Sequence, residues 1–184
     1  FSYQPFDALL LLQEVLGGSA AGTPVRPGLA ARYPDFEALY AAFLERLTAT
    51  VETLLDSNPF DELPCPLLSL LVDDCIARGR SYMRGGPVYT VRSPHAGGLA
   101  DVVNSLLVIR RLVYEKRELS LDDLAGILEA DWADQEPLRQ RIRRAFDFYG
   151  NDSAEADALM RRVFNDYTGR VGATRERHGA LRPA

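Results

Sequence analysis

The residues best placed for chemistry lie in the passage Gly85–Leu106, which reads GGPVYTVRSPHAGGLADVVNSL. His95, one of the two histidines in the chain, stands near Arg92 and just before the glycine pair Gly97-Gly98. Cationic side chains beside a glycine-rich helix start are typical of an anion-binding nest, because backbone N–H groups point outward there. The alternative is a histidine buried for hydrogen bonding. Ser93 is too close to His95 along the chain to make a convincing triad partner.

Asp73 and Asp74 form a second candidate group, because paired carboxylates serve in acid/base chemistry and in metal sites. Both lie near the end of a predicted helix, where neighbouring residues point in different directions. This geometry favours ion pairing with nearby arginines (Arg78, Arg80 and Arg84) over a shared site. The role of His95 and of the aspartate pair stays open at this stage.

The two cysteines, Cys65 and Cys75, are too few for a disulfide framework and too far apart for a C-x-x-C site. Cys65 stands between two prolines, and Cys75 falls on the apolar side of a predicted helix. Free cysteine in such a place is commonly a small hydrophobic residue. The sequence also has no P-loop, Rossmann glycine pattern, H-E-x-x-H or nucleophile elbow. We therefore predict no catalytic, cofactor-binding or metal-binding residue on this chain.

Hydrophobic spacing predicts that mostly helical elements position this passage. Asp35 and the Ser120/Asp123 pair are predicted caps, Pro137 belongs to a first turn, and Asp152 with Glu155 is expected to cap the last helix. The segment 17–34 is expected to be a loop, and 88–91 is the best strand. Predicted helices cover about 5–16, 36–55 (ending at Asn58-Pro59), 66–76, 99–114, 121–128, 135–149 and 153–171.

Composition sets the broad class. The chain has 184 residues, a net charge of −5, 47% hydrophobic and 26% charged residues. No apolar run reaches the roughly 20 residues of a membrane span, and the N-terminal segment lacks the basic region of a signal peptide. We expect a cytoplasmic protein with no membrane or nucleic-acid partner. Because 20 of the 21 basic residues are arginine, local anion contacts stay open.

The N-terminal helix is expected to be unusual, because Leu9 to Leu12 would surround more than one face and require burial from several sides. A chain that begins here hardly provides such cover. We expect a piece of something larger, with Leu9 to Leu12 and the 88–91 strand exposing apolar surface in isolation.

Four stretches resemble the central barrel segment of the glycyl radical enzymes, the pyruvate formate-lyase superfamily. They are PLLSLLVDDCIARG at 66–79, GGPVY with GGLADVVNSL at 85–106, RRLVYEKRELSLDDLAGIL at 110–128, and YGNDSAEADALMRRVFNDY at 149–167. Their order and spacing also fit the family. The first 60 residues resemble the helix and linker that follow the family's cysteine loop.

The resemblance implies a fold, mostly α-helical with one or two short strands, that is a fragment of the family's ten-stranded α/β barrel. Residues 1–171 would be the partial barrel domain and 172–184 a flexible tail. The complete parent would be an oxygen-sensitive lyase, dehydratase or acyltransferase acting on a small molecule. It would form a homodimer and carry a glycyl radical installed by a radical S-adenosylmethionine activating enzyme.

The family's radical residues are missing from this sequence. The family uses a thiyl-forming cysteine in a G-C-x-E-like loop and a radical glycine in an R-V-x-G-[YF] motif. Cys65 lacks that loop, and Arg170-Val171-Gly172-Ala173 has its glycine one place early with no aromatic residue after it. The resemblance therefore implies a central scaffold segment that is inactive by itself.

The sequence also departs from the usual G-G-A-x-Y-N and D-S-L patterns, which leaves the substrate open. The alternative from another functional class is a stand-alone helical protein-interaction domain derived from the barrel.

Overall fold

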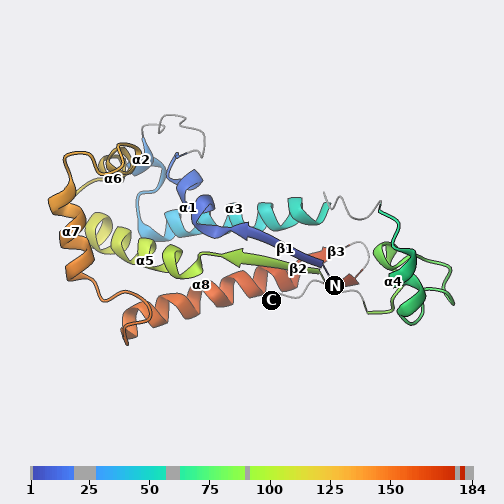
Figure 1. The fold of residues 1–184 in the computed structure, drawn as a ribbon. Helices are drawn as coiled ribbons and strands as arrows, with labels where there is room; N and C mark the ends of the chain where they lie inside the picture. The colour runs from blue at the N-terminus through green and yellow to red at the C-terminus, as the bar shows by residue number, and fades with distance from the viewer. Residues whose placement is uncertain (1, 19–27, 57–62, 90–91, 177–178, 181–184) are drawn as a thin grey trace. The chain divides into compact units, whose positions relative to one another are not determined.

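The computed structural model describes residues 2–18, 28–56, 63–89, 92–176 and 179–180. Across them the chain is mostly helical with short strands, as predicted (Figure 1). The strands form two-stranded sheets, β1 (Ser2–Asp7) with β2 (Arg92–Gly97) and β3 (Arg175–Glu176) antiparallel to β4 (Gly179–Ala180). The helices are α1 (Ala8–Val15), α2 (Leu29–Arg32), α3 (Phe36–Asp56), α4 (Pro66–Leu71), α5 (Leu99–Ile109), α6 (Leu121–Glu129), α7 (Glu136–Ala145) and α8 (Ala154–Ala173), with a 3-10 turn η2 (Tyr82–Arg84) and a π-helical turn η3 (Arg110–Glu115).

Two compact units make up the chain. We call the first the helical unit, which comprises Asp7–Leu47 and Ala96–Asp166. The second, the strand unit, comprises Phe1–Phe6, Thr48–His95 and Tyr167–Ala184. Within the described residues, no helix combines the length and the apolar character that crossing a membrane requires.

The core of the helical unit is aliphatic and aromatic, and it is drawn mainly from α3 and α5. Side chains at intervals of three and four in these helices fall on one face and are removed from water. The innermost ones are Leu39, Phe43 and Leu47 from α3, and Val102, Val103 and Leu106 from α5. Helix α1 packs against α5, and α2 packs against α6.

Asp122 fastens α2 to the start of α6. Its carboxylate accepts backbone hydrogen bonds from Gly28 (2.7 Å), Leu29 (3.0 Å) and Ala30 (2.9 Å). These are the N–H groups that a helix start leaves without a partner inside the helix. A residue more than 90 positions away in the sequence therefore supplies the cap of α2.

In the strand unit, β1 and β2 run in the same direction (Figure 1). Gln4 donates from Nε2 to the carbonyl of Leu54 at 3.2 Å. The hydroxyl of Tyr167 donates to the carbonyl of Pro94, and its ring meets Phe6 edge-on at 6.3 Å. Each strand is thus tied to the end of a long helix.

The predicted helix over 5–16 begins too early. Residues 2–7 form β1, which includes Pro5, and α1 begins at Ala8. The reason is the Asp7 carboxylate, which caps α1 by accepting from the N–H groups of Leu9 (2.9 Å) and Leu10 (3.3 Å). The expected apolar exposure holds for Val88 and Tyr89, which are exposed, but not for Leu9 to Leu12, which are buried or half-buried.

The predicted helix over 66–76 ends early as well, because α4 stops at Leu71. Val72 is extended, with φ −100° and ψ 129°, and Asp74 has φ +74°. Aspartates near a helix C-terminus oppose the dipole and compete for backbone hydrogen bonds, which accounts for the break. Cys75 therefore lies in a turn and not on a helix.

The strand predicted over 88–91 is displaced along the chain. Val88 and Tyr89 form a bend, whereas residues 90–91 lie outside the described part. The strand is β2, and the predicted Ser-Pro-His corner lies within it. A proline, which lacks an N–H, is tolerated in such a strand because, within the described residues, its sheet is two-stranded and β2 is an edge strand.

The remaining helices follow their predicted caps, with shifts at some ends. Asp35 caps α3 by accepting from Ala38 N at 2.8 Å, and Ser120 with Asp123 forms the capping box of α6. Helix α7 ends at Ala145, so Phe146 and Tyr149 lie beyond it.

The outer boundaries of the predicted elements also shift. The oxygen of Ser153, and not that of Asp152, accepts from Ala156 N at 3.4 Å at the start of α8. Residues 29–32 of the predicted loop form α2, and η3 continues α5 to Glu115. The Asn58-Pro59 stop lies outside the described residues. The predicted domain boundary at residue 171 stays a prediction, and α8 runs two residues past it, to Ala173.

Candidate functional site

The His95 group is only partly visible in the structure. His95 is half-buried in β2, and Ser93 is 1% exposed. Among the described residues, Ser93 Oγ has no hydrogen-bond partner. The side chain of Arg92 and all of His178 lie outside the described part. The anion nest at His95 therefore stays a prediction.

The aspartate pair is exposed, and the two cysteines differ in burial. Asp73 and Asp74 are exposed in the turn after α4, and Arg78 donates to the carbonyl of Gly86 at 3.0 Å. Cys75 is 2% exposed, whereas Cys65 is half-buried. No cluster of three or more metal-ligating side chains occurs in the described part of the chain.

A charged cluster on η3 joins α5 to α8 in the helical unit. Arg110 and Arg111 both donate to the carboxylate of Glu155. The hydrogen bonds, first from Arg111 and then from Arg110, hold the pKa of Glu155 below its usual range despite partial desolvation. Arg110 also lies over the ring of Phe36 at 5.7 Å. Arg110 Nε, which has no hydrogen-bond partner among the described residues, lies 3.6 Å from the carboxylate of Glu115. These contacts are structural, because the charged groups pair with one another or pack on an aromatic ring.

A second cluster surrounds Tyr40, which is 2% exposed. Its hydroxyl donates to Asp166 at 2.7 Å, and the guanidinium of Arg162 lies 4.2 Å from the ring centroid. Burial, together with the hydrogen bond to Asp166, raises the pKa of Tyr40. Glu37 completes the cluster by pairing with Arg162. A tyrosine held neutral by its surroundings serves here to join α3 to α8.

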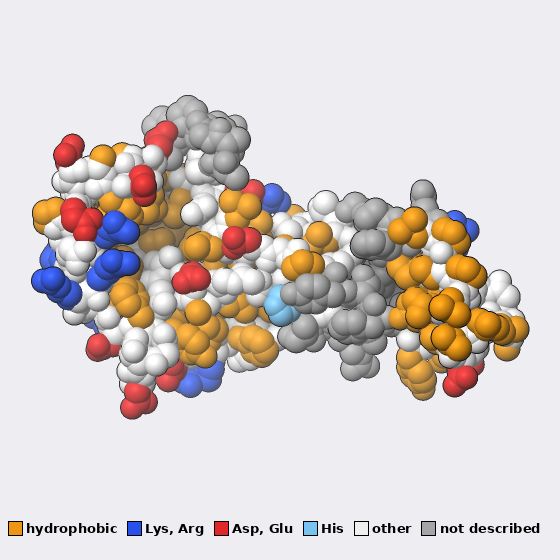
Figure 2. Space-filling view, viewed as in Figure 1, with side chains coloured by type: hydrophobic (Ala, Val, Ile, Leu, Met, Phe, Trp, Pro, Cys, Tyr) orange, Lys and Arg blue, Asp and Glu red, His pale blue; other side chains and the backbone are white. Residues whose placement is uncertain are grey.

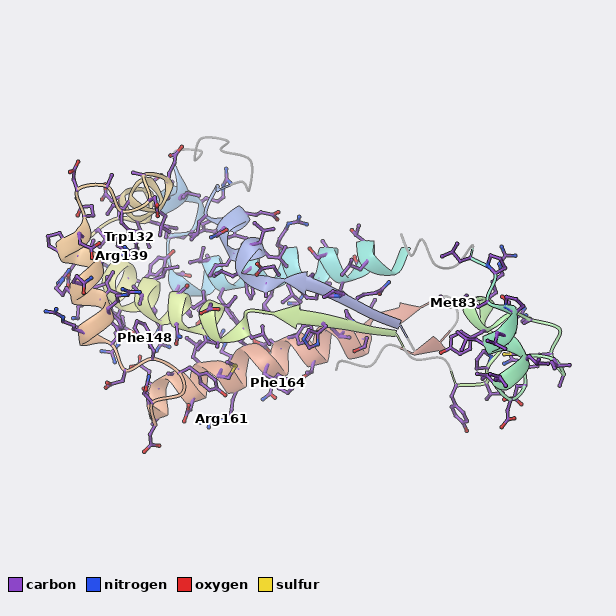
Figure 3. The ribbon with its side chains drawn as sticks, viewed as in Figure 1. Met83, Trp132, Arg139, Phe148, Arg161 and Phe164 are labelled. Carbon is purple, nitrogen blue, oxygen red and sulfur yellow. The ribbon has the colours of Figure 1, made fainter. Side chains whose placement is uncertain are left out.

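The helical unit contains a cavity of about 590 Å³, which we call the α7 groove. Most of its wall is apolar and comes from α1 with the residue that follows it, from α5 and from α6, through Leu12, Leu16, Val108, Ile109, Leu124 and Leu128. The aromatic side chains of Trp132 and Phe148 line it together with Arg139, and Figure 3 shows all three near α7. Arg143 also lines it. The groove thus joins an apolar wall to two exposed guanidinium groups and the exposed carboxylate of Asp101.

The strand unit carries a large exposed apolar area around α4, which we call the α4 surface. It is visible as a dense group of hydrophobic side chains in Figure 2. Its members are 46% to 90% exposed: Leu63, Leu67, Leu68, Leu70, Leu71, Ile76, Val88 and Tyr89. Apolar patches of this kind usually mark an interaction surface.

Comparison with known proteins shows the family to which the chain belongs. The sequence pattern of the family described as pyruvate formate lyase-like matches residues 16–183. The chain belongs to this family. The glycyl radical enzyme resemblance deduced from four stretches of sequence is therefore confirmed.

Among curated relatives, the chain is 32% identical over 145 residues to trans-4-hydroxy-L-proline dehydratase from Clostridioides difficile. That alignment covers 76% of this chain and 18% of the relative. The chain therefore spans less than a fifth of that enzyme's length.

Solved structures also match this chain over about a quarter of their own length. A structure describing 1,2-propanediol dehydration in Roseburia inulinivorans matches with a TM-score of 0.80 and 28% identity, covering 97% of this chain and 25% of the other. A glycyl radical enzyme from Archaeoglobus fulgidus matches with a TM-score of 0.79 and 26% identity, covering 96% and 24%. The fold is thus that of a segment of the glycyl radical enzyme barrel.

Sequence reasoning missed the α7 groove. Its wall combines residues from α1 to Phe148 that are far apart in the sequence. The available signals were the single tryptophan, Trp132, and the run of arginines in α7. Neither identifies a groove until the helices are packed together.

Proposed function

We propose that this chain is the central scaffold segment of a glycyl radical enzyme that removes water, or another small leaving group, from a small hydroxylated molecule. The observation that carries the proposal is the family match over 16–183, together with a dehydratase relative at 32% identity. In such a protein, the barrel holds the substrate while radical residues on loops perform the chemistry.

The radical itself would be supplied by other parts of the polypeptide. Gly172, the glycine nearest to the family's motif, lies inside the last turn of α8 and not in a loop. Cys75 is buried against Gly86, where its sulfur is 2.7 Å from the position of an added Cβ. Neither environment suits a residue that must exchange a hydrogen atom with a substrate or a partner radical, so the proposal assigns no radical residue to this chain.

The proposal includes three partners: the remainder of the barrel, a second copy of the complete enzyme, and a radical S-adenosylmethionine activating enzyme. We place the complete enzyme in the cytoplasm of an anaerobic cell. The family relationship supports the first partner most directly, because the relatives are about four times longer than this chain.

The test is activation of the complete polypeptide encoded around this segment. It is incubated without oxygen with its activating enzyme and S-adenosylmethionine, and electron paramagnetic resonance is recorded. We expect a glycyl radical signal and loss of water from a diol or hydroxyamino acid, with no radical on the 184-residue chain alone. A radical on this chain, or a gene without a cysteine loop and a glycine motif, would contradict the proposal.

The second candidate is a stand-alone interaction domain, and the α4 surface is the observation that favours it. If the cell contains only the 184-residue polypeptide, and this polypeptide is recovered with another protein on its α4 surface, the interaction domain replaces the enzyme.

A further inference from the structure

The α7 groove has the features of a docking site for a helix. Its apolar wall consists of side chains from several helices, and a helix docks by placing a row of apolar side chains in such a groove. Leu12, Leu16, Ile109 and Leu124 are buried in the wall, whereas Leu128 is 41% exposed. Apolar area that is still open to water at Leu128 would be covered by an occupant.

The charge on α7 indicates the chemistry of that occupant. Arg139 and Arg143 line the groove and are four residues apart, which places them about 6 Å apart along the helix axis. Arg139 already pairs with Glu136 at 3.3 Å, and the charge of Arg143 also acts on that carboxylate. The groove itself is lined by two guanidinium groups and one carboxylate, that of Asp101, so positive charge is in excess there. Two guanidinium groups one turn apart match two carboxylates one turn apart on a neighbouring helix.

The source of the occupant follows from the length of the relatives. In the structures from Roseburia inulinivorans and Archaeoglobus fulgidus, about three quarters of the polypeptide lies outside the part that this chain matches. Resting on the proposed function, we propose that the α7 groove receives an amphipathic helix from the remainder of the same polypeptide. That helix carries two acidic side chains, one turn apart, that pair with Arg139 and Arg143.

The experiment uses Leu128→Cys as a reporter inside the groove. The rate at which a maleimide modifies residue 128 is followed by peptide mass spectrometry, first in the 184-residue chain and then in the complete polypeptide. We expect modification to be at least about tenfold slower in the complete polypeptide, since the site then reacts only after local opening. Circular dichroism checks that the variant folds.

Two charge reversals provide a matched pair, because Arg143 lines the groove and its exposed neighbour Arg144 does not. In the complete polypeptide, Arg143→Glu should speed modification of residue 128 about threefold, the effect of losing one exposed ion pair. Arg144→Glu should leave the rate unchanged.

Equal rates in the short and complete polypeptides, or equal effects of the two reversals, would overturn the inference. In the 184-residue chain, a rate of modification at residue 128 that falls as the chain concentration rises would also overturn the inference. The occupant of the groove would then be a second copy of the chain. A complete enzyme that forms its glycyl radical while residue 128 still reacts quickly refutes the groove proposal and leaves the proposed function intact. A complete enzyme that forms no glycyl radical while residue 128 is protected from the maleimide refutes the proposed function and leaves the groove proposal intact.

Discussion

Gly86 is a position at which the strand unit has no room for a side chain. A Cβ there would lie 2.5 Å from the carbonyl oxygen of Arg80, 2.8 Å from that of Ser81 and 2.7 Å from the sulfur of Cys75. Two of these three atoms belong to the backbone and cannot move aside by changing rotamer. The glycine pair therefore allows the close backbone approach that its sequence suggests.

Gly86→Ala should lower the free energy of unfolding by about 1–3 kcal/mol, because a single extra methyl group must displace packed backbone. The measurement is urea denaturation followed by circular dichroism. Gly126→Ala is the matched control, since a Cβ on this α6 glycine meets nothing within 4 Å. That control should raise stability by about 0.5–1 kcal/mol through helix propensity. Similar losses in both variants would show that the contacts at Gly86 do not matter.

Cys75→Ala tests the interpretation of Cys75 as a small buried hydrophobic residue. Removing its buried sulfur should lower the free energy of unfolding by about 1–2 kcal/mol through lost contacts and a small cavity. In the complete enzyme, activated to the same radical content, turnover should persist. Cys65→Ala should cost less stability because Cys65 is only half-buried. A folded, radical-bearing Cys75→Ala enzyme without any turnover would make Cys75 a catalytic residue.

At the scale of elements, Asp122 shows how one carboxylate connects two helices. Backbone hydrogen bonds, the first from Ala30 and the others from Leu29 and Gly28, hold the pKa of Asp122 below its usual value of about 4. The folded state therefore binds a proton less readily than the unfolded state. The contribution to stability is fully present above the unfolded pKa and is lost as pH falls through the lowered folded pKa.

Asp122→Asn should accordingly lower the melting temperature at pH 7. The difference from the wild-type chain should begin to shrink as pH falls through about 4, the pKa of the unfolded chain. It should vanish only below the lowered folded pKa, where both proteins carry a neutral side chain. The measurement is a series of thermal scans between neutral and acid pH. Glu129→Gln, at the exposed end of the same helix, should change the melting temperature little at any pH. A constant difference at all pH values would rule out the charged cap.

Element boundaries were predictable where a cap residue acts locally. Asp35 and Ser120 accept hydrogen bonds from N–H groups three residues ahead, so sequence alone indicates the starts of α3 and α6. Strand β1 was missed because its partner β2 lies about 90 residues away, and Pro5 fits a helix first turn equally well. The early end of α4 depends on Val72 and Asp74, whose backbone angles override an apolar pattern that is typical of a longer helix.

At the scale of the whole molecule, the predicted helix over 66–76 is an exception, because its apolar residues face water. Leu67, Leu70 and Leu71 are 64% to 71% exposed on α4, a helix of only six residues. The spacing of these leucines predicts a buried helix face, and that prediction holds only if another surface covers them. The sequence therefore carries information about a neighbour that the described residues do not supply.

Leu67→Ser combined with Leu71→Ser should weaken self-association of the 184-residue chain at least about tenfold, since burying one leucine is worth about 1.5–3 kcal/mol. Sedimentation equilibrium measures the association constant, and binding of a hydrophobic dye reports the exposed area. Phe164→Ser is the control, because Phe164 is 46% exposed on α8 and lies outside the α4 surface. In the complete polypeptide the α4 surface should be covered, and the double substitution should instead lower the melting temperature. A wild-type chain that stays monomeric and binds no dye would show that these leucines do not form a sticky surface in isolation.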